Sequence, residues 1–192
     1  PEGYEGNWKE DINILEEDFQ DTVLEAENTL VRLPCGEITV TKKIREDDDQ
    51  DKVGNQGWND LADFEIGQTV PYRYESNMPD VNGYNTYYYA WHDVMSEALT
   101  FKKDSVAIRI YESSNARNYY ELKEDEFEVK EAPGGGDTFQ VVVSDMKKII
   151  DREFNRKNEA GENKYGQKIV LTYQATLNEK AAKNTGRPGF EN

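Results

Sequence analysis

Cysteine and histidine are nearly absent from this 192-residue chain, and each absence excludes classes of function. Cys35 is the only cysteine and His92 the only histidine. One cysteine cannot form an internal disulfide, and this pair cannot supply the four ligands of a usual zinc site. A Cys/His nucleophile pair has suitable residue types, but Cys35 lies in a Leu-Pro-Cys-Gly turn, where a small buried cysteine is the simpler interpretation. We therefore expect neither a metal nor a cofactor.

Long apolar runs and positive charge are also scarce. No segment approaches the roughly 18 apolar residues of a membrane helix, and no signal peptide is visible. A chain that starts at Pro1 is expected to have been processed or cut from a longer protein. The formal charge is -16, from 39 acidic and 23 basic residues. A field of that sign repels phosphate, so we expect neither a nucleic-acid partner nor membrane insertion.

Tyrosine is abundant, with 12 copies, and this argues for an ordered chain although only 36% of the residues are hydrophobic. The length favours one domain, or one domain with an appendage. The apolar residues of the first 33 positions recur at roughly helical spacing, with a strand ending at Leu33 as the alternative. We expect residues 1–33 to be a linker or the end of a preceding domain, and residues 34–192 to form one domain.

A period of two dominates the pattern after residue 36, which is typical of half-buried strands. Strands are expected over residues 38–44, 64–76, 86–94, 105–111, 127–129, 138–143 and 168–177. Ser144 and Asp145 read as a helix cap, and an apolar stripe from Met146 to Phe154 predicts a short crossover helix after them. About seven strands with one small helix predict an all-β sandwich.

Two charged residues occupy positions that the alternation assigns to the interior. Lys42 shares the parity of Val40 and Ile44, and Asp93 shares that of Tyr89 and Trp91. In one interpretation both strands end there and the charges reach solvent, since lysine stems extend easily to water. In the other, the two side chains form a buried pair, because lone buried charges are costly unless they meet or neutralise each other.

A buried Lys–Asp pair has a specific chemical use. A lysine amine in an apolar pocket has a depressed pKa and becomes a nucleophile. A carboxylic acid in the same pocket stays protonated and can polarise an asparagine carboxamide. Attack by the amine then expels ammonia and leaves an intramolecular isopeptide bond.

Four stretches of the chain carry a likeness to one known family: Ile38-Thr-Val-Thr-Lys-Lys-Ile44, Ile66-Gly-Gln-Thr-Val-Pro-Tyr72, Tyr89-Ala-Trp-His-Asp-Val-Met-Ser-Glu-Ala-Leu-Thr-Phe101 and Ile169-Val-Leu-Thr-Tyr-Gln-Ala-Thr-Leu-Asn-Glu-Lys-Ala181. Together they resemble the isopeptide-forming domain of Gram-positive fimbrial (pilin) subunits, from residue 37 to the end of the chain. The third and fourth stretches are specific, because their order, spacing and residue types all fit. The resemblance implies an immunoglobulin-like (collagen-adhesin-like) β-sandwich.

The resemblance also implies roles for individual residues. The family's nucleophilic lysine matches Lys42, and the aspartate that promotes the bond matches Asp93. The family's asparagine begins the last strand; Asn192 matches it best, with Asn184 and Asn178 as weaker matches. The sequence departs from the family in two places. It stops at Asn192, before the strand that normally carries the asparagine, and its loop over residues 45–63 is long and acidic.

These observations predict a structural domain of a bacterial surface pilus or adhesin, stabilised by an autocatalytic Lys–Asn isopeptide bond. The expected location is extracellular, in a pilus or anchored to the cell wall. The expected partners are other pilin subunits or domains of the same surface protein, with a host extracellular ligand as a further option. Neither a Leu-Pro-x-Thr-Gly sorting signal nor a Tyr-Pro-Lys motif is present in the sequence.

Two other classes of function were compared with this one. The alternative is an adhesin module that binds a host glycan or matrix protein, with calcium as an option because Asp47, Asp49 and Asp51 alternate as in a calcium loop. However, Lys52 and Trp58 stand where such a loop needs glycine and glutamate, so a solvated acidic loop is simpler. An enzyme is not expected, because the chain has no Gly-rich phosphate loop, nucleophile elbow or metal cluster.

Overall fold

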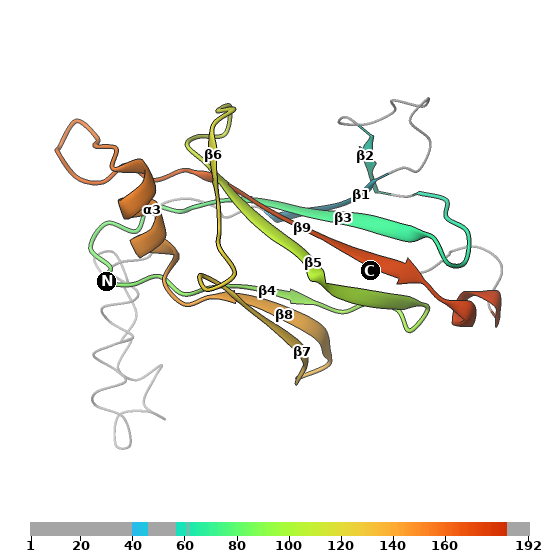
Figure 1. Cartoon of the computed structure of the whole chain (residues 1–192). Helices are drawn as coiled ribbons and strands as arrows, with labels where there is room; N and C mark the ends of the chain where they lie inside the picture. Colours follow the sequence, from blue (N-terminus) through green and yellow to red (C-terminus); the bar gives the residue numbers. More distant parts are fainter. Residues whose placement is uncertain (1–39, 46–56, 61, 184–192) are drawn as a thin grey trace, which may run out of the picture.

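Two antiparallel β-sheets packed face to face form the body of the protein, whose structure is a computed structural model that describes residues 40–45, 57–60 and 62–183 (Figure 1). The larger sheet has the strand order β2-β1-β3-β9-β5-β6, and the smaller one the order β4-β8-β7. The prediction of an all-β, immunoglobulin-like sandwich with one short helix is confirmed. The segment 1–33, expected to be a linker or part of a preceding domain, lies outside the described residues.

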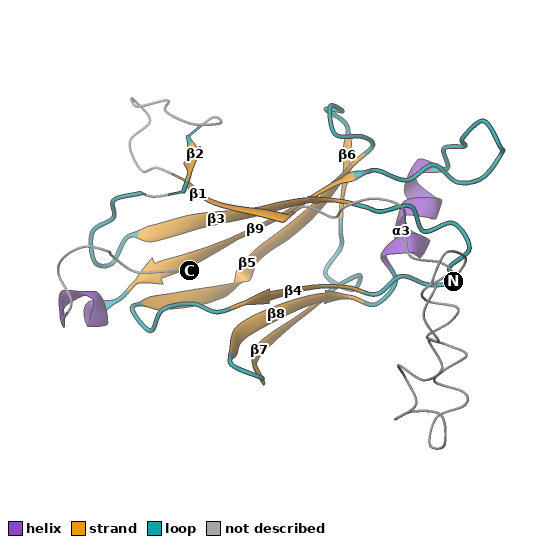
Figure 2. Cartoon of the chain, turned by 180° about the vertical axis from the view of Figure 1, so that it is seen from behind, coloured by secondary structure: helices purple, strands orange, loops and turns teal. Residues whose placement is uncertain are grey.

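The strands of the larger sheet are β1 (Val40–Arg45), β2 (Trp58–Asn59), β3 (Thr69–Asn77), β5 (Leu99–Tyr111), β6 (Tyr119–Glu121) and β9 (Lys168–Leu177). Those of the smaller sheet are β4 (Tyr89–Asp93), β7 (Glu128–Gly134) and β8 (Asp137–Val143). Figure 2 shows the two layers from behind, with β4, β7 and β8 forming the lower layer.

The core lies between the layers and is built from alternate residues of the central strands, as a period of two requires. The buried side chains of the larger sheet include Val70, Tyr72, Tyr74, Ile169, Leu171, Tyr173 and Ala175. Those of the smaller sheet include Tyr89, Trp91, Phe139, Val141 and Val143. The core is therefore rich in tyrosine and places hydroxyl groups inside an otherwise apolar layer.

The first strand departs from the predicted pattern at one residue. The alternation assigns Val40 to the interior together with Lys42 and Ile44, but Val40 is 54% exposed, whereas Lys42 and Ile44 are half-buried. Among the described residues, β2 pairs with β1 only at Ile44 and Arg45. Val40 therefore lies at an uncovered edge of the sheet, which explains its exposure.

The long strand β5 begins six residues earlier than the strand predicted over 105–111. Its register against β9 shifts between Lys102 and Ala107, and a polar stretch fills this β-bulge. The hydroxyl of Ser105 holds the bulge together, because it donates to the Lys102 carbonyl and accepts from the Gln174 amide at 2.8 Å. The polar residues of the bulge interrupt the alternation and hide the first half of the strand from a sequence pattern.

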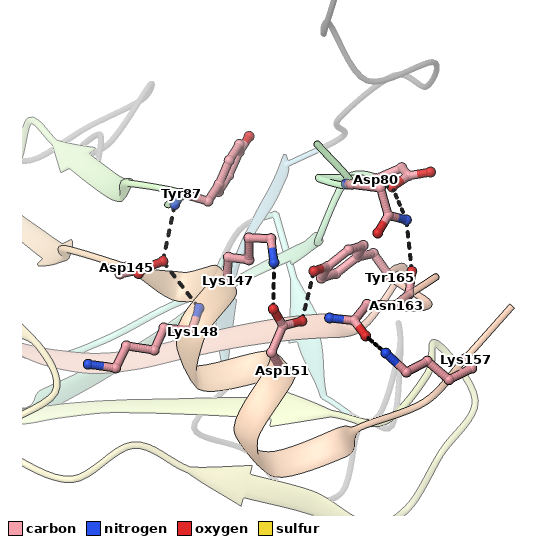
Figure 3. Close-up of polar contacts among 10 residues, drawn as sticks. Asp80, Tyr87, Asp145, Lys147, Lys148, Asp151, Lys157, Asn163 and Tyr165 are labelled. Atoms are coloured by element: carbon pink, nitrogen blue, oxygen red, sulfur yellow. Dashed lines mark hydrogen bonds and ion pairs between the residues drawn. The ribbon is translucent and has the colours of Figure 1, made fainter. Parts of the chain in front are cut away.

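Within the described residues, one α-helix, α3 (Met146–Phe154), crosses from β8 towards β9 at one end of the sandwich, as predicted. Asp145 caps it, since its Oδ1 accepts from the backbone N–H of Lys148 at 3.1 Å. The same oxygen accepts from the Tyr87 N–H, so the cap also fixes the segment that leads into β4 (Figure 3). A short 3-10 helix, η2 (Glu179–Lys183), follows β9. Within the described ranges, no helix is both long and apolar enough to cross a membrane.

Candidate functional site

Lys42 and Asp93, the two charged residues at predicted interior positions, meet across the sandwich. Lys42 lies on β1 of the larger sheet and Asp93 at the end of β4 in the smaller one. The Nζ of Lys42 is 3.0 Å from Oδ2 of Asp93, and the Asp93 side chain is 0% exposed while that of Lys42 is 21% exposed. The structure therefore has the buried-pair arrangement, not two charges that reach solvent.

Strand register explains how the pair comes together. Lys42 lies opposite Tyr74 in the β1–β3 ladder, and Asp93 lies opposite Phe139 in the β4–β8 ladder. Because both residues keep the parity of the buried side chains on their strands, both point into the space between the sheets. A shift of either strand by one residue would turn its charge away from the core.

Two tyrosine hydroxyls complete the surroundings of the carboxylate. Tyr74 on β3 and Tyr173 on β9 donate to Oδ2 of Asp93 at 2.8 Å and 2.6 Å. The strands predicted over residues 64–76 and 168–177 contain both tyrosines, but sequence reasoning did not connect them to Asp93. Their phenolic hydroxyls were the available signal, since a buried Tyr O–H usually needs a hydrogen-bond partner.

Burial sets the proton affinities in this cluster. Loss of water around Lys42 lowers the pKa of its amine, and the charge and hydrogen bond of Asp93 oppose that shift without reversing it. Burial, followed by the charge of Asp93, raises the pKa of Tyr74 above its usual range. The Lys42 amine also lies 5.5 Å and 5.3 Å from the ring centroids of Tyr72 and Tyr74. The site therefore makes the Lys42 amine easier to deprotonate and keeps the Tyr74 phenol protonated.

A second Lys–Asp pair, on α3, differs from the pair of Lys42 and Asp93 in the direction in which the lysine pKa is shifted. Lys147 and Asp151 are four residues apart on the helix, and Tyr165 donates to the other carboxylate oxygen at 2.7 Å (Figure 3). The hydrogen bond to Asp151 is the main cause of a raised pKa for Lys147. This pair therefore keeps its lysine charged, whereas the environment of Lys42 disfavours the charge.

An open side of the sandwich borders the buried pair. Among the described residues, Val40–Lys43 of β1 and all of β4 lack a second strand neighbour on this side. A groove of about 360 Å³ lies there, lined by Val40, Tyr74 and residues 87–92. In the part of the chain that the structure describes, the buried Nε1 of Trp91 has no hydrogen-bond partner. Unpaired strand edges and an apolar groove are features that another extended segment can cover.

The asparagine predicted to react with Lys42 cannot be placed. Asn192 and its weaker alternative Asn184 lie outside the described residues. Asn178 is described and caps η2, because its Oδ1 accepts from the Lys180 N–H at 3.0 Å. The register places Leu171 at the level of Lys42, and Asn178 lies seven residues farther along, about 23 Å away at about 3.3 Å per residue. Asn178 therefore serves as a turn residue.

Most of the residues considered for calcium binding and for a Cys/His pair lie outside the described ranges. The described ranges contain no group of three or more potential metal-ligating residues. Asp47, Asp49, Asp51 and Cys35 lie outside them. His92 sits on the outer face of β4, where its Nδ1 is 2.7 Å from Oδ2 of Asp137. That exposed pair has the geometry of a surface ion pair.

Comparisons with known proteins find likeness in solved structures alone. No family model and no curated protein matches the chain. The pilus backbone RrgB of Streptococcus pneumoniae shares 19% identity over 76% of this chain and 47% of its own, with a TM-score of 0.45. The full-length major pilin RrgB of the same organism shares 19% identity over 76% of this chain and 21% of its own, with a TM-score of 0.44. The T6 backbone pilin of serotype M6 Streptococcus pyogenes shares 18% identity over 81% of this chain and 28% of its own, with a TM-score of 0.46. The chain thus spans less than half the length of these proteins, which belong to the class that its sequence resembles.

Proposed function

We propose that this chain is a structural domain of a bacterial surface pilus or adhesin, stabilised by an isopeptide bond that Lys42 forms with Asn192. The observation that carries the proposal is the buried pair: a lysine with a lowered pKa, 3.0 Å from a fully buried carboxylate on the opposite sheet. Such a pair is costly for folding alone, since well-packed apolar residues would stabilise a core as well or better. A role in forming a covalent bond would explain why the core contains this pair.

The bond-forming step is a transamidation that balances within the protein. In the neutral form of the pair, one proton has moved from the Lys42 ammonium to the Asp93 carboxyl. The Nζ of Lys42 attacks Cγ of the asparagine, a C–N bond forms, and the carboxyl protonates the carboxamide. The bond from Cγ to Nδ2 then breaks, ammonia leaves with the proton that the carboxyl gave, and the proton that Nζ loses goes to Asp93. No oxidant or external cofactor is needed, and Asp93 ends in the state in which it began.

The open edge of β1 supplies a place for the acceptor. A strand that pairs with Val40–Lys43 would run beside Lys42 and cover the groove between β1 and β4. An asparagine at the level of Lys42 on such a strand would place its carboxamide next to the amine. We assign that place to the segment that begins at Asn192, which is the match that the family resemblance favours.

The domain acts on itself and not on an external substrate. Its proposed setting is extracellular, in a pilus or anchored to the cell wall, with other pilin subunits or domains of the same protein as partners. A covalent link between the first strand and the last would carry tension that a ladder of hydrogen bonds would otherwise bear. The bond would also hold the chain end against fraying and proteolysis.

Ligand binding is the second candidate function. Tyr88 is 60% exposed and lines the same groove as Val40, and exposed apolar patches beside a groove suit a ligand. In this alternative the chain is an adhesin module for a host glycan or matrix protein. Melting with and without calcium tests the acidic loop at Asp47–Asp51, and a rise in melting temperature with calcium favours the adhesin.

Peptide mapping by tandem mass spectrometry tests the proposal and locates the acceptor. The 192-residue chain is compared with a longer form, or with an added peptide, that continues the strand beginning at Asn192. We expect a branched peptide that joins Lys42 to Asn192 and lacks one ammonia, formed without added enzyme. A Lys42 that stays unmodified in the longer form contradicts the proposal.

A further inference from the structure

The carboxylate of Asp93 is bonded at one of its two oxygens. Lys42, Tyr74 and Tyr173 all donate to Oδ2, at 3.0, 2.8 and 2.6 Å. Oδ1 is buried as well, yet it has no hydrogen-bond partner among the residues that the structure describes. Buried polar atoms are nearly always hydrogen-bonded, so an unbonded oxygen on a fully buried carboxylate requires an explanation.

The two phenols that hold Oδ2 are fixed by their packing. Tyr173 is 1% exposed, stacks on Tyr72 with ring centroids 5.2 Å apart, and meets Phe139 edge-on at 5.0 Å. Tyr74 and Tyr173 stack at 6.1 Å. Because neighbouring rings restrict both side chains, their phenolic oxygens are held beside Oδ2 of Asp93. The asymmetry is therefore built into the aromatic core.

We propose that Tyr74 and Tyr173 are positioning residues, which hold Asp93 by Oδ2 and keep Oδ1 available for the carboxamide that reacts with Lys42. This inference rests on the proposed function and adds to it a separate role for each carboxylate oxygen of Asp93. Oδ2 accepts the proton that the Lys42 nitrogen gives up. Oδ1 delivers a proton to the departing carboxamide nitrogen.

The shuttle balances without a net change at Asp93. The carboxyl starts with its proton on Oδ1. When the tetrahedral adduct collapses, the Nζ–H bond breaks and its proton goes to Oδ2, while the Oδ1 proton goes to Nδ2 of the asparagine. The bond from Cγ to Nδ2 breaks, the Cγ carbonyl reforms, and ammonia departs. Asp93 again carries one proton, now on the other oxygen.

The Tyr74 phenol suits this task because it remains protonated. The pKa of Tyr74 is raised, chiefly by burial and then by the charge of Asp93. Tyr74 therefore remains a donor at any pH at which the lysine amine becomes neutral. The groups that face the carboxylate come from three strands: Lys42 from β1, Tyr74 from β3 and Tyr173 from β9.

The test compares rates of ammonia loss in variants that remove one hydroxyl each. Tyr74→Phe, Tyr173→Phe and the double variant are made in the longer form that continues the strand at Asn192, and intact mass is followed over time across a range of pH. Tyr165→Phe is the matched control, because it removes a half-buried hydroxyl that donates to another aspartate, Asp151, at 2.7 Å, and Tyr165 does not line the groove. Circular dichroism and melting confirm that each variant folds.

We expect each of the two positioning variants to lose ammonia about tenfold more slowly, and the double variant more slowly still. We also expect the acid limb of the pH profile to move to higher pH, because the phenols stabilise the ionised carboxylate. Tyr165→Phe should keep the rate and the profile of the unsubstituted protein. A merely structural role would change stability and leave the pH profile in place.

Two results would overturn the inference, and they differ. If the unsubstituted protein forms the bond and both Tyr→Phe variants keep its rate and pH profile, the tyrosines have no positioning role while the proposed function stands. If the unsubstituted longer form loses no ammonia, the proposed function fails and the inference fails with it.

Discussion

At the scale of single residues, the pair of Lys42 and Asp93 combines two effects that oppose each other. Burial removes water from both groups and disfavours charge, whereas their contact at 3.0 Å favours it. For Lys42 the loss of water is the larger effect. The Lys42 amine therefore loses its proton more easily than an exposed lysine does, and nucleophilic attack requires an unprotonated amine.

Replacing Asp93 should separate folding from bond formation. We expect Asp93→Ala to leave the fold intact and to stop the loss of ammonia, because the carboxamide loses its proton donor. Asp137→Ala is the control, since it removes a carboxylate from the outer face of the smaller sheet, where Asp137 contacts His92. Circular dichroism and intact mass measure both outcomes. Ammonia loss at the normal rate in Asp93→Ala would show that Asp93 has no such role.

The pH dependence of stability gives an independent test of the Lys42 environment. In a background where Asn184 and Asn192 are alanine, the bond cannot form with either residue. The folded pKa of Lys42 lies below its ordinary value of 10.5, so its contribution to stability is full above pH 10.5 and is lost as the pH falls through the folded pKa. Relative to Lys42→Met, the unsubstituted background should therefore gain stability as the pH rises towards 10.5 in urea titrations.

Lys147 provides a control, because its pKa is shifted in the opposite direction from that of Lys42. Its pKa is raised from 10.5, mainly by the hydrogen bond to Asp151. The contribution of Lys147 is therefore complete below pH 10.5 and is lost as the pH rises through the folded pKa. Lys147→Met should accordingly show no gain for the unsubstituted background towards pH 10.5. If both lysines gave the same trend, the assignment of a desolvated Lys42 would be wrong.

At the scale of elements, α3 depends on one side chain that serves two segments. Asp145 accepts from the backbone of Lys148 inside the helix and from the backbone of Tyr87 ahead of β4. The cap thus connects the crossover helix to the strand that carries Asp93.

Removing this cap should cost stability. We expect Asp145→Ala to lower the free energy of unfolding by about 1–2 kcal/mol, because two backbone N–H groups, that of Lys148 and the half-buried one of Tyr87, lose their acceptor. Lys148→Ala is the matched control, since it keeps the backbone donor and removes only an exposed side chain. Urea unfolding of both variants measures the difference. Equal stability of the two variants would contradict the role of the cap.

The elements differ in how well their residues predict them. Strands β3 and β9 alternate cleanly from Val70 and Ile169, and the helix after Asp145 has both a cap and an apolar stripe, so all three could be predicted. The first half of β5 could not, because the polar bulge at Ser105 breaks its period. The two-residue strand β2 is too short for any period to show.

The charged residues of the candidate site could be predicted from the sequence, but the two tyrosine hydroxyls that bond Asp93 could not. A charged residue at a strand position where the alternation requires an apolar one can be recognised from the sequence alone. Lys42 and Asp93 both stand out in this way. A buried tyrosine satisfies the same pattern as a phenylalanine, so the convergence of Tyr74 and Tyr173 on one oxygen depends on the packing of three strands. The exposure of Val40 likewise depends on which neighbour covers β1.

At the scale of the whole molecule, the proposed bond would close a loop of about 150 residues between Lys42 and Asn192. Closure of a loop of that size stabilises a fold by about 5 kcal/mol on chain-entropy grounds, an upper value taken from disulfides. The net charge of -16 adds self-repulsion that opposes the compact state. A covalent closure therefore suits this chain.

Loss of the closure should be visible in thermal unfolding. In the longer form that continues the strand at Asn192, we expect Lys42→Ala to lower the melting temperature by about 10–20 °C, from about 5 kcal/mol at about 2–4 °C per kcal/mol. Lys43→Ala is the matched control on the same strand, because Lys43 pairs with the exposed Asp60. Similar melting temperatures in the two variants would remove the stabilising role from Lys42.

Intact-mass spectrometry of the longer form, with and without Lys42, tests the central claim most directly. The claim is that Lys42 forms a covalent bond with an asparagine carboxamide without the help of another enzyme. The account predicts that the unsubstituted protein is lighter than its sequence mass by one ammonia, and that Lys42→Ala has its full sequence mass. A protein that retains its full mass with Lys42 present would contradict the account.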